Sequence, residues 1–315
     1  MRCDLCEGIG ARGFLEKDFH GGIVFPCDRC GSTGLVVTTD SRERAASESP
    51  AHPGGRLRDA ELSVGASQGA GGGAASEKLA PPPLRVLSLG AGVQSTTMAL
   101  MSQNAALPRI DCAIFADTGE EPRAVYEHLE RIKGWVSFPI HVVRAWDGRG
   151  KPSIKGPLGD EIIASTRGEG KAGLHSRPPF FTRNPDGSGG MLRRHCTGDY
   201  KIDPIQQEIR ALLGLRRGQR WPTEPVVEQW IGISTDEATR MKPSMLPAIR
   251  SRWPLIEKGM SRSDCLAWLE RHGYLPLPPK SACTFCPFHS DSEWRWLRDE
   301  DPESWARACQ IDDAI

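Results

Sequence analysis

Short apolar runs alternate with amphipathic stretches along the second part of the chain. The runs have the length of buried strands, and the stretches between them place apolar residues three and four positions apart, as a helix face does. The predicted strands are Leu84–Leu89, Asp111–Ala116, Ile140–Arg144 and Val226–Ile233. The predicted helices are Ser95–Met101, Pro122–Lys133, Ile202–Leu213 and Arg262–His272. This alternation predicts an α/β fold with a doubly wound, mostly parallel sheet, in which ligands bind at the carboxyl ends of the strands.

The pattern changes outside these elements. Residues 1–36 are rich in cysteine and glycine, whereas residues 37–83 consist mainly of Ser, Ala, Gly, Glu and Pro, a composition typical of a disordered linker. We therefore expect a small ribbon, a linker, and a main domain at 84–315 with a C-terminal cysteine-bearing region. Residues 146–195 show little periodicity and are expected to form an insertion or lid over the site.

Charge and cysteine content narrow the classes of function. Forty Lys and Arg residues balance forty Asp and Glu residues, so there is no global positive field, although a local basic cluster leaves a polyanionic partner open. This cluster comprises Arg193, Arg194, His195 and Lys201. No stretch approaches the roughly 20 apolar residues of a membrane span, and we expect a cytoplasmic protein with no membrane partner. Ten cysteines in a reducing compartment favour metal binding or chemistry over disulfides.

The first cysteine set consists of two Cys-x-x-Cys knuckles, "CDLCEGIG" and "CDRCGSTG". Their thiolates, Cys3, Cys6, Cys27 and Cys30, have the number and spacing that suit tetrahedral Zn²⁺. The pattern resembles the zinc ribbon of DnaJ-type proteins, but only two of the usual four repeats are present. We expect a metal-stapled docking module without chaperone activity.

A glycine-rich turn follows the first predicted strand, in "VLSLGAGVQSTT". Gly90 and Gly92 allow backbone N–H groups to approach a phosphate, and the next helix directs its positive end toward it. The turn has neither the lysine of a Walker loop nor the third glycine of a Rossmann fingerprint. A simple turn with a serine N-cap is the alternative explanation.

Residues 88–96 resemble the phosphate loop of the PP-loop adenine nucleotide α-hydrolase superfamily, and the ordered motifs over about 84–300 resemble its PAPS reductase-like family. The usual loop reads Ser-Gly-Gly-x-Asp-Ser, and here Gln94 stands where the aspartate is expected. The resemblance implies binding of ATP or a PAPS-like adenine nucleotide with Mg²⁺. The residues expected at the phosphates are Ser88, Gly90, Gly92, Gln94, Ser95 and Thr96.

Two further strand ends carry motifs familiar in this family. "FADTGEEP" places Asp117, Thr118 and Gly119 where the resemblance implies contact with the adenosine, although an N-cap explains part of the motif. "GISTDEATR" supplies Ser234, Asp236, Glu237 and Arg240 after the fourth strand. Ser234 and Glu237 also fit a capping box, whereas Arg240 is expected to meet a phosphate or sulfate.

The second cysteine set comprises Cys196, beside Lys201, and the Cys283–Cys286 pair. Cys265 completes a four-thiolate set, but its apolar helical neighbours equally indicate a buried structural cysteine. Four thiolates suit a second Zn²⁺ or a [4Fe–4S] cluster, and the resemblance favours the cluster. We expect Cys196, Lys201 and Arg240 to act in catalysis.

Together these motifs predict an ATP-pyrophosphatase-type sulfurtransferase. It would adenylate a substrate, with nucleic acid as one candidate, and transfer sulfur from a donor through the cluster. One alternative is a reductase of phosphoadenosine or adenosine phosphosulfate that takes electrons from a thioredoxin-like protein. The other is a non-catalytic, zinc-stapled adaptor that binds a nucleotide.

Overall fold

The computed structural model describes residues 23–26, 33–36, 83–167, 178–216 and 218–315. Strands β1 (Ile23–Pro26) and β2 (Thr33–Val36) form an antiparallel pair in a unit of their own. The four predicted zinc ligands near the N-terminus and the predicted linker lie outside the described residues, so both stay predictions.

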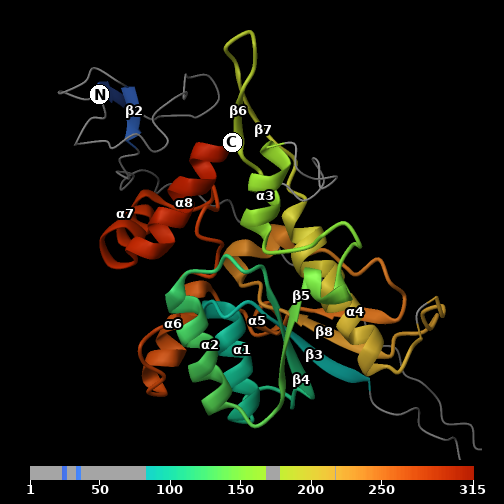
Figure 1. The fold of residues 1–315 in the computed structure, drawn as a ribbon. Helices are drawn as coiled ribbons and strands as arrows, with labels where there is room; N and C mark the ends of the chain where they lie inside the picture. The colour runs from blue at the N-terminus through green and yellow to red at the C-terminus, as the bar shows by residue number, and fades with distance from the viewer. Residues whose placement is uncertain (1–22, 27–32, 37–82, 168–177, 217) are drawn as a thin grey trace, which may run out of the picture. The chain divides into compact units, whose positions relative to one another are not determined.

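A five-stranded parallel sheet forms the centre of the main domain, in the order β5-β4-β3-β8-β9 (Figure 1). The strands are β3 (Leu84–Leu89), β4 (Cys112–Asp117), β5 (Ile140–Arg144), β8 (Val227–Ile231) and β9 (Ile249–Arg252). All four predicted strands are confirmed within a few residues. The edge strand β9 is additional, and its sequence, Ile-Arg-Ser-Arg, has too few apolar residues to stand out from a loop.

Helices cover both faces of the sheet, as predicted (Figure 1). Successive residues of a strand point to opposite faces, so Leu87 joins one apolar cluster and its neighbour Val86 joins another. The first cluster is covered by α1 (Val93–Gln103), α2 (Arg123–Trp135), α5 (Pro254–Glu257) and α6 (Arg262–Arg271). On the other face lies α4 (Asp203–Leu212), which buries Ile205 and Ile209.

A third apolar cluster joins the region 146–195 to the C-terminal helices. It is built around Leu158, Tyr200, Phe285 and Ile311. The elements here are η1 (Ala145–Arg149), α3 (Leu158–Thr166), β6 (Phe181–Arg183), β7 (Gly189–Met191), η2 (Gly198–Ile202), α7 (Asp291–Glu300) and α8 (Pro302–Ala314). The predicted insertion therefore contains a helix and a hairpin that its Gly- and Pro-rich composition obscured. None of the described helices is both long and apolar enough to cross a membrane.

Candidate functional site

The sheet changes winding direction between β3 and β8, because β4 and β5 follow β3 on one side and β8 and β9 lie on the other. In doubly wound sheets such a switch point opens a crevice at the carboxyl ends of the strands, where ligands bind. The two loops that leave these neighbouring strands are the glycine loop before α1 and the segment before η3 (Thr235–Arg240). Both segments carry residues that the sequence predicts to bind the nucleotide.

The two loops are in direct contact. The Gln94 amide donates hydrogen bonds to Ser234 Oγ at 3.3 Å and to the Glu237 carboxylate at 3.4 Å. A Cβ atom on Gly232 would lie 3.0 Å from the backbone nitrogen of Ser95, so only glycine allows this approach without a shift. Gln94 therefore ties the two loops together.

The glycine loop holds a fixed, partly strained conformation. Ala91 adopts a φ of +55°, in the left-handed region that costs a non-glycine residue about 1 to 2 kcal/mol. Ser95 Oγ accepts a hydrogen bond from the Gly90 N–H at 3.2 Å and donates one to the Gly92 carbonyl at 3.3 Å. Strain of this kind persists where the surroundings impose it, commonly at ligand-binding sites.

Two further predicted phosphate ligands, Thr96 and Ser88, also have partners within the domain. Thr96 is fully buried, and its hydroxyl lies 3.1 Å from Nε2 of His128 on α2. Burial lowers the pKa of His128 to about 4, so its ring is neutral at physiological pH. Ser88 Oγ accepts a hydrogen bond from the Gln229 amide at 2.9 Å. Both hydroxyls thus stabilise the elements behind the loop.

The β4 loop brings the second motif to the same edge. Asp117 is buried and accepts hydrogen bonds from the Gly119 N–H, the Tyr126 hydroxyl and the Arg144 guanidinium, at 2.8 to 2.9 Å. Gly119 has a φ of +75°, and a Cβ there would lie 2.7 Å from Pro157. Asp117 and Gly119 therefore shape the loop, and Thr118 is left to face the cysteine-bearing segment.

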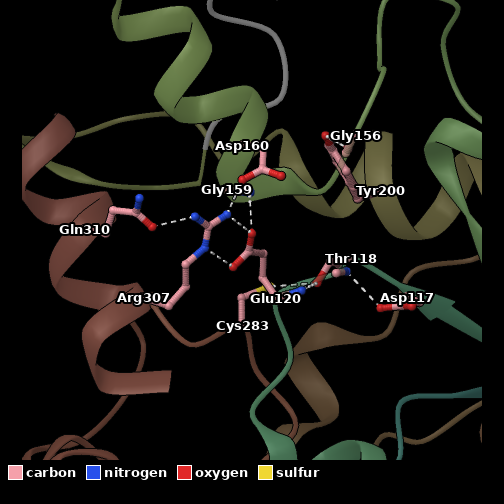
Figure 2. Close-up of polar contacts among 11 residues, drawn as sticks. Asp117, Thr118, Glu120, Gly156, Gly159, Asp160, Tyr200, Cys283, Arg307 and Gln310 are labelled. Carbon is pink, nitrogen blue, oxygen red and sulfur yellow. Dashed lines mark hydrogen bonds and ion pairs between the residues drawn. The ribbon is translucent and has the colours of Figure 1, made fainter. Parts of the chain in front are cut away.

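The segment that contains Cys283 and Cys286 contacts both the glycine loop and the β4 loop. The Ser281 hydroxyl donates to the Gly90 carbonyl, and the Thr284 N–H donates to the Glu120 carbonyl at 2.7 Å. Figure 2 shows Cys283 beside Thr118, whose hydroxyl lies 3.2 Å from the sulfur atom. Residues more than 160 positions apart in sequence thus meet at the carboxyl edge of the sheet.

Lys201 interacts with three charged or polarisable partners at this edge. Its amine lies 3.1 Å from the carboxylate of Glu121, whose side chain is 1% exposed. Burial opposes the charge on Lys201, but Glu121, Cys283 and Cys196 outweigh this and raise the pKa of its amine. Burial and Glu121 in turn raise the pKa of the Cys283 thiol, although Lys201 acts against them.

The structure brings together three of the four cysteines in the second set. Cys286 interacts electrostatically with Cys196 and Cys283, and its pKa is raised mainly by burial. Cys265 lies apart in the cluster under α1 and α6, where its thiol hydrogen-bonds to Thr97. Its surroundings are those of a buried structural cysteine, the alternative that its sequence also allowed.

The donor chemistry of Cys196, Cys283 and Cys286 suits a soft metal or an iron–sulfur cluster. However, the described part of the chain contains no group of three or more His, Cys, Asp or Glu side chains arranged to hold a metal ion. A metal or cluster at these three cysteines stays a prediction of the sequence.

The η3 segment is the most exposed part of the edge. Asp236 accepts a hydrogen bond from the backbone N–H of Arg262 at 3.0 Å, and its own carboxylate is exposed. Arg240 lies 2.5 Å from Glu237 and is 59% exposed. The Arg240 guanidinium is therefore accessible to solvent while it pairs with Glu237.

One buried ion pair at the edge was not predicted. Arg307 of α8 donates to both carboxylate oxygens of Glu120, at 2.6 and 3.0 Å, and also contacts Asp160 at 2.6 Å (Figure 2). Glu120 is 2% exposed and receives a further N–H bond from Gly159 at 3.1 Å. No local pattern connects Glu120 with Arg307, which lies 187 residues away, so only the fold reveals the pair.

This chain can be compared with known proteins both by sequence and by structure. Neither the protein-family models nor the curated proteins contain a match to this sequence. Among solved structures, the chain is similar to a phosphoadenylyl-sulfate (PAPS) reductase from Candida auris, solved as a phosphate complex. The TM-score is 0.39 and the identity 14%, over 64% of this chain and 76% of that chain.

Proposed function

We propose that the main domain is a PP-loop-type enzyme that binds an adenine nucleotide at the carboxyl edge of its sheet. The observation that carries this proposal is the meeting of the glycine loop and the η3 segment at the switch point of the sheet, joined through Gln94 and Ser234. Helix α1 begins directly after Gly92 and directs its positive end toward this crevice. The order of the sequence motifs along the strands agrees with the resemblance described above.

The proposed reaction is cleavage of ATP between the α and β phosphates. A nucleophilic oxygen or nitrogen of the acceptor attacks the α phosphorus, the bond to the bridging oxygen breaks, and pyrophosphate leaves with the electron pair. The glycine-loop amides, Lys201 and Arg240 lie at the same edge and stabilise negative charge as it develops. Asp236 and Glu237 provide exposed or half-exposed carboxylates that suit Mg²⁺, which supplies charge neutralisation at phosphate oxygens when bound.

Lys201 has a second role in this proposal as a mobile countercharge. It remains protonated because the adjacent Glu121 carboxylate raises its pKa against the effect of burial. When a phosphate enters, the amine exchanges part of its interaction with Glu121 for the anion. Transfer of sulfur to the adenylated acceptor, a nucleic-acid acceptor and a cytoplasmic location stay predictions of the sequence.

A second candidate reaction uses the cysteines directly. In a sulfonucleotide reductase, one thiolate attacks the sulfur of the sulfate group and releases the nucleotide. A second thiolate then attacks the resulting S-sulfocysteine, which forms a disulfide and releases sulfite, and a thioredoxin-like dithiol reduces the disulfide. The grouping of Cys196, Cys283 and Cys286 around Lys201 favours this reaction, whereas the raised pKa values of Cys283 and Cys286 disfavour it.

Product analysis distinguishes these reactions. The full chain is incubated with Mg²⁺ and ATP, with and without short single-stranded RNA or DNA as acceptor, and AMP and pyrophosphate are quantified. In parallel, PAPS is supplied with reduced thioredoxin and sulfite is quantified. We expect AMP and pyrophosphate in equal amounts, and a loss of at least about tenfold in Arg240→Ala if its charge stabilises the transition state. ADP and phosphate would contradict the proposal, sulfite would favour the reductase, and binding without turnover would favour the adaptor.

A further inference from the structure

The β6–β7 hairpin, which projects from the main domain in Figure 1, exposes large apolar side chains on one face. Phe181 and Met191 are directly paired across its two strands, so their side chains lie on the same face, where they are 50% and 48% exposed. Phe180, one residue earlier, packs instead against Phe285, with the ring centroids 6.2 Å apart. The hairpin is thus anchored through Phe180 and presents the Phe181–Met191 pair to solvent.

Arginines lie on and beside this face. Arg183 shares it with the apolar pair, because side chains two positions apart in a strand point the same way. Its cross-strand partner is Gly189, where a Cβ would meet nothing within 4 Å. Arg183 and Arg193, which follows β7, are both exposed, and neither forms an ion pair with the described part of the chain. Since Asp186 is the one acidic residue of 178–196, this stretch carries an excess of positive charge.

The positive stretch continues to the cysteines of the proposed site. Arg194 is exposed, and its guanidinium lies 5.5 Å from the centre of the Phe288 ring, which is itself 47% exposed. Arg194 and Lys201 both interact electrostatically with Cys286, two residues before Phe288. The stacked Arg194–Phe288 pair therefore lies beside the group formed by Lys201 and the cysteines.

The mixture of guanidinium groups and exposed rings favours one kind of polyanion. Arginines bind phosphates without regard to sequence, and unpaired bases stack on aromatic side chains or on arginine itself. A duplex keeps the faces of its bases inside its own stack, and an acidic peptide has no flat rings to offer. A mononucleotide held at the glycine loop has no second base or phosphodiester for the hairpin.

We propose that this hairpin surface binds a single-stranded nucleic acid and guides it to the proposed site. The surface comprises Phe181, Arg183, Met191, Arg193, Arg194 and Phe288. The three arginines pair with phosphodiester groups, while unpaired bases contact the ring of Phe288 and the Phe181–Met191 pair. This inference names the acceptor of the proposed function and rests on it for the reaction, whereas the binding itself requires neither ATP nor Mg²⁺.

Binding to the full chain is measured without ATP by fluorescence anisotropy over a series of salt concentrations. The probes are a short single strand, made as DNA and as RNA, an abasic strand of equal length, and the corresponding duplex. The variants are Arg183→Ala/Arg193→Ala and Phe288→Ala. The matched control is Arg250→Ala/Arg271→Ala, which removes two exposed arginines, one on β9 and one at the end of α6. Calorimetry gives the ATP affinity of each protein.

We expect the single strand to bind more tightly than the duplex or the abasic strand, and tighter binding of RNA or of DNA identifies the sugar. Arg183→Ala/Arg193→Ala should weaken single-strand binding about tenfold or more and lower the slope of log K against log salt by about 1.4, since each lost phosphate contact removes about 0.7. Phe288→Ala should weaken binding of the intact strand about fivefold or more and leave the abasic strand unchanged. The control variant and the ATP affinity of the hairpin variant should match the wild type.

The inference is overturned if no single strand binds, if the control variant loses as much affinity as the hairpin variant, or if the duplex or abasic strand binds as tightly. A loss of ATP affinity in Arg183→Ala/Arg193→Ala would also overturn it, because these arginines would then serve the mononucleotide. Since strand binding is measured without ATP, its failure leaves the proposed ATP cleavage standing. Strand binding without any ATP cleavage would contradict the proposed function alone.

Discussion

The Arg307→Ala substitution removes the cation that pairs with the buried Glu120 carboxylate. Within the described part of the chain, Glu120 would keep only the Gly159 N–H, at 3.1 Å, and its side chain is 2% exposed. Breaking a buried ion pair by removing one partner costs roughly 3 to 5 kcal/mol, because an uncompensated charge is left behind. Arg307 is itself 24% exposed, so water can replace part of the guanidinium. We therefore expect a loss of about 3 kcal/mol in the free energy of unfolding.

Urea unfolding and thermal melting measure this loss. For a domain of this size, about 3 kcal/mol corresponds to a decrease in Tm of roughly 6 to 12 °C. The matched control is Arg123→Ala, which removes an exposed pair with Glu127, 3.6 Å apart, in which the side chains are 69% and 56% exposed. We expect that substitution to cost less than about 0.5 kcal/mol.

A double variant separates lost charge compensation from lost packing. Because the neutral amide of Glu120→Gln does not require a cation, adding this substitution to Arg307→Ala should recover part of the lost stability. The reasoning is refuted if Arg307→Ala costs no more than Arg123→Ala, or if Glu120→Gln makes Arg307→Ala still less stable. Since the Glu120 carbonyl accepts the Thr284 N–H, Arg307→Ala is also expected to increase hydrogen exchange at Thr284.

Three further predictions concern the buried His128, the β4 loop at Gly119, and the two cysteine sets. Because His128 has a pKa of about 4 when folded and about 6.5 when unfolded, only the unfolded chain takes up its proton between these values, so stability falls as pH decreases through this window. Urea unfolding at pH 7 and pH 4.5 should show that His128→Phe removes about 2 to 3 kcal/mol of this acid sensitivity, and an unchanged difference would contradict the assignment. Gly119→Ala should lower Tm by several degrees, because its φ is +75° and its new Cβ would meet Pro157 at 2.7 Å; an unchanged melting curve would show that the loop is not held as described. Metal analysis and visible spectra of anaerobically purified protein should show the zinc predicted from the N-terminal cysteines and the iron of the predicted cluster, with the iron lost in a Cys283→Ala/Cys286→Ala variant; zinc alone, unchanged in that variant, would contradict a cluster at these cysteines.

Local periodicity was sufficient to predict the centre of the fold. The strands Leu84–Leu89 and Ile140–Arg144 match their predicted bounds, because both are apolar runs bounded by charged or turn-forming residues. Helices α7 and α8 were missed, although Ser290 and Glu293 form a capping box at the start of α7 that its sequence could have revealed. Both helices are rich in charged and polar residues and bury few apolar side chains, so their sequences offer little for a periodicity argument.

The candidate site was only partly accessible to sequence reasoning. The glycine loop and the η3 segment were predictable because each follows a buried strand, and parallel strands end at one edge. The contacts of Cys283 with Thr118 and of Arg307 with Glu120 depend on packing between residues more than 160 positions apart. The sequence could not decide whether Cys265 is a core residue or a metal ligand, because its position along the chain suits both.

The measurement that tests the central claim most directly is equilibrium binding of ATP to the wild-type chain and to Gly92→Val. A Cβ on Gly92 would already lie 3.3 Å from the Ser281 side chain, so a larger side chain narrows the loop at the proposed phosphate position. Gly134→Val is the control, because a Cβ there meets nothing within 4 Å. We predict saturable ATP binding that Gly92→Val weakens by about tenfold or more while Gly134→Val leaves it unchanged. Equal ATP affinity in all three proteins, with folding intact, would contradict a nucleotide site at the glycine loop.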